Sequence, residues 1–279
     1  MQSKHPRTFS FEFFPPKTPV GEEKLRATWK QLATLKPKFF SVTFGAGGST
    51  RDRTLGTVLE IQTSGSAAAP HLSCIGSTRE DIAAILELYK SQGVKHIVAL
   101  RGDLPSGAAS AGELRHANEL VSFIREKTGD HFVIEVACYP EFHPQAKSAQ
   151  DDLANFKRKV DAGANSALTQ YFFNADSYFR FMEDCGRLGI TIPVVPGIMP
   201  IANFSQLARF SAACGADIPQ WLRRKMEGFG DDAESIRSLG LDVVTELCER
   251  LLAQGAPGLH FYTMNQAELT TTIWKRLGL

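Results

Sequence analysis

Several features are missing from this sequence of 279 residues, and each absence excludes a class of protein. Lys and Arg number 31 and Asp and Glu 30, so the formal net charge is +1, without the basic excess typical of proteins that bind nucleic acids or membrane surfaces. No run approaches the ~18 consecutive apolar residues that span a bilayer, and the start, "MQSKHPRTF", lacks the apolar segment of a signal peptide. We therefore expect a cytoplasmic protein with neither nucleic-acid nor membrane partners.

Cysteine pairs and metal-binding motifs are also absent. The five cysteines are widely spaced and form no C-x-x-C pair, which argues against a disulfide framework or a structural zinc site and favours small buried thiols. The seven histidines show neither H-x-H nor H-E-x-x-H spacing, so we predict no metal site. No G-x-S-x-G elbow follows a strand pattern, which disfavours a Ser-His-Asp hydrolase. Because no linker, low-complexity tract or repeat interrupts the chain, residues 1–279 are expected to form a single domain.

Short apolar or β-branched runs recur along the chain and alternate with helical patterns, which is typical of βα units that build a parallel sheet. In the intervening segments apolar residues lie three and four positions apart, as at Leu25, Trp29 and Leu32. Glycines at 93, 163, 189 and 255 are predicted to end helices, and Thr78 with Asp81 resembles an N-terminal capping pair. The predicted strands are 8–14, 38–44, 70–75, 96–100, 132–138, 166–172, 192–197 and 258–263.

Eight such units in ~250 residues predict a closed (β/α)8 barrel, whose catalytic groups lie at the carboxyl ends of the strands. A doubly wound open sheet is the structural alternative, but it usually has a glycine-rich fingerprint after its first strand. Here the first strand runs into Pro15 and Pro16 instead. The stretch 203–257, before the last strand, is too long for one helix and is predicted to contain extra helices.

Polar residues gather at the predicted carboxyl ends of the strands. Glu12 is the most unusual of them because it lies in a row of phenylalanines, and strand alternation places it on the same face as Ser10 and Phe14. If that face is the barrel interior, burial raises the pKa of Glu12, and a nearby Asp103 would raise it further. A carboxyl group that stays protonated near neutral pH is a general acid. The alternative is a buried Glu paired with Arg or Lys for structural reasons. The full set is Glu12, Thr43, Arg101, Asp103, Tyr139, Glu141, His143, Gln170 and Tyr262.

Three further motifs follow strands and allow more than one interpretation. "FGAGGST" (44–50) lacks the spacing of a P-loop or a dinucleotide fingerprint, and a tight turn explains it equally well. "ALRGDLP" places Arg101 and Asp103 two residues apart, either as site residues or as a local ion pair. Helical spacing aligns Asp152, Asn155 and Lys159 on one face, which taken alone is more typical of a solvated surface.

Eight ordered motifs together resemble one family, the methylenetetrahydrofolate reductases in their short bacterial form without a regulatory domain. The motifs are "FEFFPPK", "SVTFGAGGS", "PHLSCI", "ALRGDLP", "YPEFHPQAKS", "DAGANSALTQYFF", "VPGIMPIANF" and "LHFYTMN". The resemblance implies an FAD-binding (β/α)8 barrel in which NADH or NADPH reduces the flavin. The flavin then passes a hydride to 5,10-methylenetetrahydrofolate to give 5-methyltetrahydrofolate for methionine synthesis, with ping-pong kinetics. It also implies a homo-oligomer.

By the same resemblance, Glu12 is the acid that protonates N10 of the folate so that a 5-iminium ion forms. Asp103 lies beside the flavin and the pterin, where its charge stabilises that cation. Arg101 and Lys159 supply positive charge for the diphosphate. Folate or nicotinamide contacts are implied for Gln170, Gln206, Phe210 and, as the weakest match, Gln266, where many relatives have an Arg that meets the glutamate tail. The implied cofactor contacts are Thr43, Phe44, Ala46, His71, Arg101, Gly102, Asp103, Ala117, Tyr139, His143, Asp152, Asn155 and Lys159.

Two other hypotheses remain open on sequence grounds. One is a different flavin-dependent barrel, such as a proline-dehydrogenase-like oxidase of a small amine. The other is a folate- or flavin-binding protein without turnover, which the presence of both Glu12 and Asp103 argues against.

Overall fold

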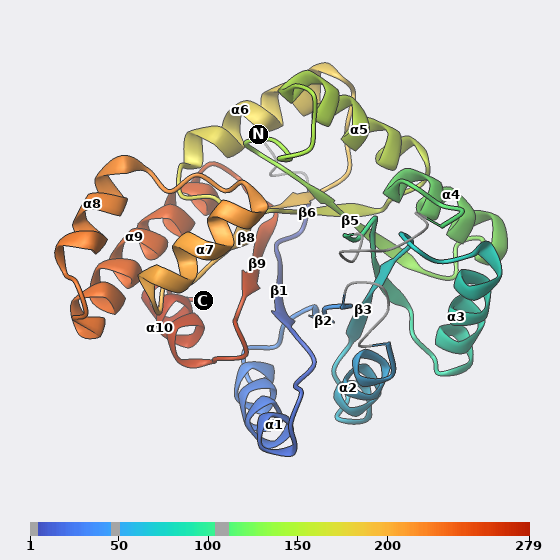
Figure 1. The fold of residues 1–279 in the computed structure, drawn as a ribbon, viewed down its shortest axis with the longest axis horizontal. Helices are drawn as coiled ribbons and strands as arrows, with labels where there is room; N and C mark the ends of the chain where they lie inside the picture. Colours follow the sequence, from blue (N-terminus) through green and yellow to red (C-terminus); the bar gives the residue numbers. More distant parts are fainter. Residues whose placement is uncertain (1–4, 46–50, 104–111) are drawn as a thin grey trace.

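The computed structural model describes residues 5–45, 51–103 and 112–279, so Ala46 lies outside the described residues. Its centre is a ring of parallel strands surrounded by helices (Figure 1). The strands lie close to the predicted positions, with boundaries that differ by up to three residues. They are β1 (Thr8–Phe13), β2 (Phe39–Val42), β3 (Ala68–Ser73), β4 (His96–Leu100), β5 (Val133–Cys138), β6 (Ser166–Thr169), β7 (Val194–Val195), β8 (Gly197–Ile198) and β9 (Gly258–Tyr262).

The seventh predicted strand is present as two short pieces, β7 and β8, separated by Pro196. A proline has no backbone N–H to donate to a neighbouring strand, so the ladder is interrupted at this residue. β7 pairs with β6 and β8 pairs with β9, which in turn pairs with β1. His260 N also donates to Pro196 O (2.9 Å). The interrupted strand therefore joins both of its neighbours and closes the predicted (β/α)8 barrel.

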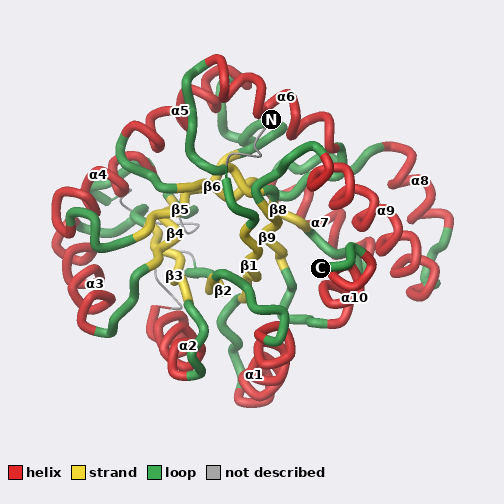
Figure 2. Tube along the Cα trace, turned by 180° about the vertical axis from the view of Figure 1, so that it is seen from behind, coloured by secondary structure: helices red, strands yellow, loops and turns green. Residues whose placement is uncertain are grey.

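Helices surround the barrel, as the view from behind shows (Figure 2). Three of them, α7 to α9, lie between the seventh strand and β9, so the prediction of extra helices within 203–257 is confirmed. No helix of the described ranges is long and apolar enough to cross a membrane. The helices are α1 (Pro19–Ala33), α2 (Arg51–Thr63), α3 (Arg79–Ser91), α4 (Ala117–Thr128), α5 (Ala149–Asp161), α6 (Ala175–Arg187), α7 (Phe204–Cys214), α8 (Gln220–Gly228), α9 (Ala233–Ala253) and α10 (Glu268–Arg276).

Local sequence signals explain where several helices begin and end. The Thr78 side chain accepts from Asp81 N, and the Asp81 carboxylate accepts from Thr78 N in return, so the predicted capping box begins α3. The four glycines predicted to end helices lie just after α3, α5, α6 and α9 with φ between 67° and 111°. Only a residue without a Cβ adopts that conformation at little cost.

The core has two parts, and the division places the site. A large apolar layer packs between the strands and the helices, and the rings of Phe11 and Phe13 belong to it. A small cluster fills the barrel interior: Phe39, Ala69, Val98, Leu168 and Val195. The opposite face of β1, which carries Ser10 and Glu12, therefore points into the barrel, so the condition left open by the sequence is met.

Candidate active site

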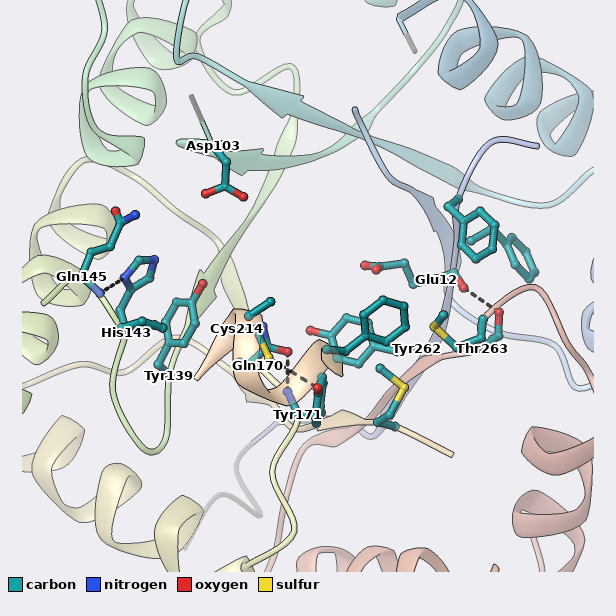
Figure 3. Close-up of a pocket in the computed structure, with 17 residues that line it drawn as sticks. Glu12, Asp103, Tyr139, His143, Gln145, Gln170, Tyr171, Cys214, Tyr262 and Thr263 are labelled. Atoms are coloured by element: carbon teal, nitrogen blue, oxygen red, sulfur yellow. Dashed lines mark hydrogen bonds between the residues drawn. The ribbon is translucent and has the colours of Figure 1, made fainter. Parts of the chain in front are cut away.

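A cavity of about 460 Å³ opens at the carboxyl ends of the strands, the end at which (β/α)8 barrels place their active sites. Its walls come from β1, the segments that follow β4, β5, β6 and β9, and α7. Figure 3 shows that the labelled side chains converge on this space from different parts of the chain. The predicted site residues that line it are Glu12, Asp103, Tyr139, His143, Gln170, Phe210 and Tyr262.

Glu12 lies between two imidazoles at the floor of this cavity. Its Oε2 atom is 3.2 Å from His71 Nε2 and 3.4 Å from His260 Nε2, and its side chain is 15% exposed. The His71 contact has the distance of an ion pair but not the alignment of a hydrogen bond. Ser10 Oγ lies 2.7 Å from His260 Nδ1, on the far side of that ring. Ser10, His260 and Glu12 therefore form a continuous polar line that ends in the cavity.

These imidazoles reverse the expected protonation state of Glu12. Burial raises the pKa of the carboxyl group, but the charges of His71 and His260 and the hydrogen bond to His260 outweigh it and lower the pKa from 4.5 to about 2. The expectation that Glu12 stays protonated in the ligand-free protein is therefore wrong. Its partners are also His rather than the Arg or Lys of the structural alternative. The group is a carboxylate with two potential proton donors beside it.

Asp103 lines the same cavity but lies apart from Glu12, on another side (Figure 3). Its side chain is 88% exposed, and Oδ1 is 3.8 Å from the Arg101 guanidinium. The local ion pair that the sequence allowed is thus present. Asp103 does not raise the pKa of Glu12 as expected, because the solvated carboxylate is directed at the cavity and at Arg101 rather than at Glu12.

Arg101 begins a chain of contacts that holds the loop after β5. Its Nη2 atom donates to Gln145 Oε1 (2.7 Å), Gln145 N donates to His143 Nδ1 (3.0 Å), and His143 N donates to Asp152 Oδ2 (2.9 Å). The Tyr139 ring packs edge-on against His143. These contacts hold the loop that forms this wall of the cavity. Asp152 holds the backbone of His143 in place.

Lys159 and Asn155 are directed elsewhere. The Lys159 ammonium donates to Ala137 O (2.6 Å), and burial lowers its pKa. Asn155 bonds to Asp151 and Arg158 of its own helix. Arg101 is therefore the better placed cation for a ligand phosphate at this site, and Lys159 is engaged with the barrel wall.

The other implied cofactor residues surround the cavity without lining it. Thr43 N donates to Phe13 O, and Phe44 follows it in the half-buried loop after β2. Gly102 has φ of 80°, and a Cβ there would come within 2.8 Å of the Ser73 side chain. Ala117 is the first residue of α4. The Cys74 thiol lies 3.7 Å from Arg101 O, just after β4, and 3.8 Å from His116 O, just before α4. The start of α4 therefore lies close to the end of β4.

A much smaller hollow of about 30 Å³ adjoins the cavity. Phe210, Thr263 and Met264 line both spaces, whereas Gln206 and Gln266 line only the smaller one of the two. Gln170 lies in the main cavity, where its Oε1 accepts from Tyr171 N (3.0 Å). The folate or nicotinamide residues implied by the resemblance thus lie along one side of the site.

The sequence reasoning missed His260 and Gln145. His260 is two residues before Tyr262 on β9, so strand alternation alone would have placed it on the same inward face. Gln145 had no comparable signal, because a loop has no fixed side-chain period. Its role depends on Arg101, which is 44 positions away.

The residues present fit a flavin nucleotide. Aromatic and amide side chains line the cavity, Arg101 stands at its edge as a partner for phosphate, and the buried His71 Nε2 lacks a hydrogen-bond partner. Concave, mostly apolar sites with a few placed polar groups are typical of cofactor sites.

Comparisons with known proteins identify the family of this chain. The family model described as methylenetetrahydrofolate reductase matches residues 1–278. The 5,10-methylenetetrahydrofolate reductase of Salmonella typhimurium is 45% identical over 271 residues, which are 97% of this chain and 90% of that protein. Methylenetetrahydrofolate reductase (NADH) 1 of Arabidopsis thaliana is 40% identical, over 97% of this chain and 48% of the plant protein.

A solved structure supports the fold. An uncharacterised protein from Clostridium thermocellum, which binds two copies of 5-methyl-5,6,7,8-tetrahydrofolic acid, superposes with a TM-score of 0.70 at 15% identity. The match covers 97% of this chain and 94% of that one. The family model and the sequence relatives, which span nearly the whole chain, show that it belongs to the methylenetetrahydrofolate reductase family.

Proposed function

We propose that this protein reduces 5,10-methylenetetrahydrofolate to 5-methyltetrahydrofolate, with NADH or NADPH as electron donor and FAD as cofactor. The observation that carries the proposal is the Glu12 carboxylate, flanked by two imidazoles, at the floor of a cavity in a chain with full-length similarity to reductases of this substrate. The Arabidopsis relative, named methylenetetrahydrofolate reductase (NADH) 1, favours NADH as the donor. FAD, when bound, would supply the chemistry for hydride transfer between the nicotinamide and the folate, in two ping-pong half-reactions.

Glu12 and its neighbours deliver the proton in this account. Folate N10 is weakly basic and must be protonated for the five-membered ring to open to the 5-iminium ion. Glu12 is ionised in the free protein, so the proton reaches N10 through Glu12 from His260 or His71. A folate that fills the cavity removes water from Glu12, which raises the pKa of the carboxyl group and favours its protonation at that moment.

The remaining side chains position the ligands and stabilise the cationic iminium. Asp103 presents a negative charge to the cavity, where it stabilises the cationic iminium. Gln170 offers an amide that can orient the pterin, while Tyr139 and Tyr262 exclude water from the walls. Arg101, held by Gln145, is the proposed phosphate partner of the cofactor. The proposal treats residues 1–279 as one catalytic domain that assembles into a homo-oligomer.

The visible spectrum of the purified protein tests the proposal. Under anaerobic conditions, we expect a flavin spectrum that bleaches with NADH and returns when methylenetetrahydrofolate is added. A protein that remains colourless after incubation with FAD would remove the reductase proposal. Bleaching by NADH without recovery on addition of the folate would favour another flavin-dependent barrel.

A further inference from the structure

Two walls of the cavity meet at the end of α7. One wall is α7 itself, which carries Phe210. The other is the loop after β5, residues 139–145, whose contacts lead to Arg101. We propose that Glu141 and Tyr171 are positioning residues, which fasten the end of α7 to this loop and to the barrel and so fix the two walls relative to each other. The inference rests on the proposed function and adds to it the residues that hold the substrate side of the site.

Glu141 joins the loop to the segment that follows α7. Its Oε2 atom accepts from Asp217 N (2.8 Å), and the side chain is half-buried. Hydrogen bonds to an ionised acceptor are stronger than those between neutral groups. Glu141 itself does not line the cavity. Its contact can therefore act on a ligand only through the wall that it holds.

The turn that ends α7 packs directly against the same loop. Gly215 has φ of 77°, a conformation that a residue without a Cβ adopts at little cost. A Cβ at Gly215 would lie 2.6 Å from Pro144 Cγ, closer than two carbon atoms can approach. The gap lined by Tyr139, Glu141 and Gly215 has a volume of about 10 Å³, close to the smallest space that holds one water. The loop and the turn are therefore in close contact.

Tyr171 fastens the last turn of α7 to the barrel. It follows β6 and is buried, and its hydroxyl oxygen lies 3.0 Å from Ser211 Oγ. The Cys214 thiol donates to the same hydroxyl (3.4 Å). Burial raises the pKa of Tyr171, so the hydroxyl keeps its proton and can donate to Ser211 while it accepts from Cys214. Figure 3 shows Tyr171 and Cys214 near each other at the cavity that both residues line.

The fastened turn adjoins the part of α7 that faces the ligands. Phe210 immediately precedes Ser211, and Gln206 lies four residues before Phe210, on the same face of the helix. Both residues line the small hollow. A shift at the end of α7 would therefore move both side chains. Glu12 and Asp103 come from β1 and the end of β4, so their positions do not depend on α7. Loss of these contacts should weaken substrate binding more than the chemical step.

The first test separates binding from chemistry. In Glu141→Ala, the KM for methylenetetrahydrofolate should rise about 2- to 10-fold, the scale of one lost hydrogen bond, with kcat nearly unchanged. Glu141→Gln keeps an oxygen that can accept from Asp217 N and should restore the KM. Hydrogen exchange within 204–214, followed by mass spectrometry, should be faster in Glu141→Ala than in Glu141→Gln. Because the loop also holds Arg101, the Glu141→Ala holoprotein should release its flavin at a lower temperature, as measured by flavin fluorescence.

A double-mutant cycle tests the contact between Tyr171 and Ser211. Ser211 is buried and does not line the cavity, so Ser211→Ala removes the contact without removing a group that faces a ligand. Ser211→Ala and Tyr171→Phe should each raise the KM about 2- to 10-fold. The double variant should show no further rise, because both single variants remove the same hydrogen bond. Tyr178→Phe is a matched control, since it removes a buried hydroxyl that donates to Val194 O (2.8 Å) away from the cavity.

The outcomes distinguish the positioning role from the proposed function. Wild-type KM values in both Glu141→Ala and Ser211→Ala would overturn the positioning role, while the proposed function stood. An equal rise of KM in Tyr178→Phe would also overturn it, because the rise would then reflect a general loss of stability. If wild-type protein reduced no methylenetetrahydrofolate, the proposed function would fail, and the positioning role with it.

Discussion

His260 Nε2 lies 3.4 Å from Glu12 Oε2, although the two residues are 248 positions apart in the chain. The first and last strands of the barrel pair side by side, with Ser10 opposite His260 and Glu12 opposite Tyr262. Closing the barrel is therefore what assembles the proposed proton path. Any change that separates β1 from β9 should affect catalysis as well as stability.

The lowered pKa of Glu12 should be visible in acid unfolding. Because the folded-state pKa of about 2 lies below the ordinary 4.5, the ionised carboxylate stabilises the folded protein. This contribution is fully present above pH 4.5 and is lost as the pH falls toward 2, and its size is on the order of 3 kcal/mol. Urea unfolding of wild type and Glu12→Gln, from neutral pH down into this window, should show a shallower loss of stability in the variant. Parallel curves would contradict the ion pairing.

Ser10 should act as a positioning residue through His260. Without its hydroxyl, the His260 ring loses the 2.7 Å contact that orients Nε2 toward Glu12. We expect Ser10→Ala to slow folate reduction about 10-fold, a fraction of a full general-acid contribution, and to change its pH profile. The reduction of menadione by NADH, in which menadione replaces the folate as electron acceptor and no proton at N10 is needed, should be retained. Ser10→Thr should restore the rate, and the buried Ser177→Ala on α6 should leave it unchanged. Equal folate activity in Ser10→Ala and wild type would exclude this role.

Asp103 should matter through its charge rather than its shape. Asp103→Asn keeps the side-chain volume but removes the negative charge proposed to stabilise the iminium. We expect kcat for folate reduction to fall about 10²-fold, the scale found for the loss of one electrostatic partner of a transition state. Asp130→Asn is a matched control, because Asp130 is also exposed and lies 3.9 Å from an arginine, Arg125, away from the cavity. Similar rates for both variants would show that the charge at position 103 is not used.

The outer aromatic layer should carry much of the stability. Phe11 is fully buried, and its ring centroid lies within 6 Å of Phe40, Phe261 and Trp274. Phe11→Ala should lower the free energy of unfolding by about 3–5 kcal/mol. Val20→Ala on exposed α1 should change it by less than about 0.5 kcal/mol. Denaturant unfolding of the two variants measures the difference directly.

Sequence patterns predicted the barrel well because each strand and helix carries its own local signal. Alternation placed Glu12 and Phe11 on opposite faces of the first strand, and the capping pair at Thr78 and the helix-ending glycines were confirmed. The interruption at Pro196 was not foreseen, although proline chemistry explains it. A local sequence pattern determines which face of a strand a residue occupies. It does not determine which other strands lie beside that face.

The site was harder to predict for the same reason. The pKa of Glu12 depends on imidazoles from β3 and β9, and these partners become neighbours only when the barrel closes. Lys159 was correctly placed on α5 by its spacing, but its length lets it reach the Ala137 carbonyl instead of solvent. How far a side chain extends and which rotamer it adopts depend on tertiary packing. The spacing of residues along a helix does not encode either.

The most direct test of the account separates the two half-reactions in Glu12→Gln. The glutamine keeps the size of the side chain but cannot pass a proton to N10. In anaerobic stopped-flow experiments, we predict that NADH bleaches the variant's flavin at nearly the wild-type rate. Methylenetetrahydrofolate should then reoxidise it at least about 10²-fold more slowly than wild type. Reoxidation at the wild-type rate would show that Glu12 does not carry the proton, and the central claim would fail.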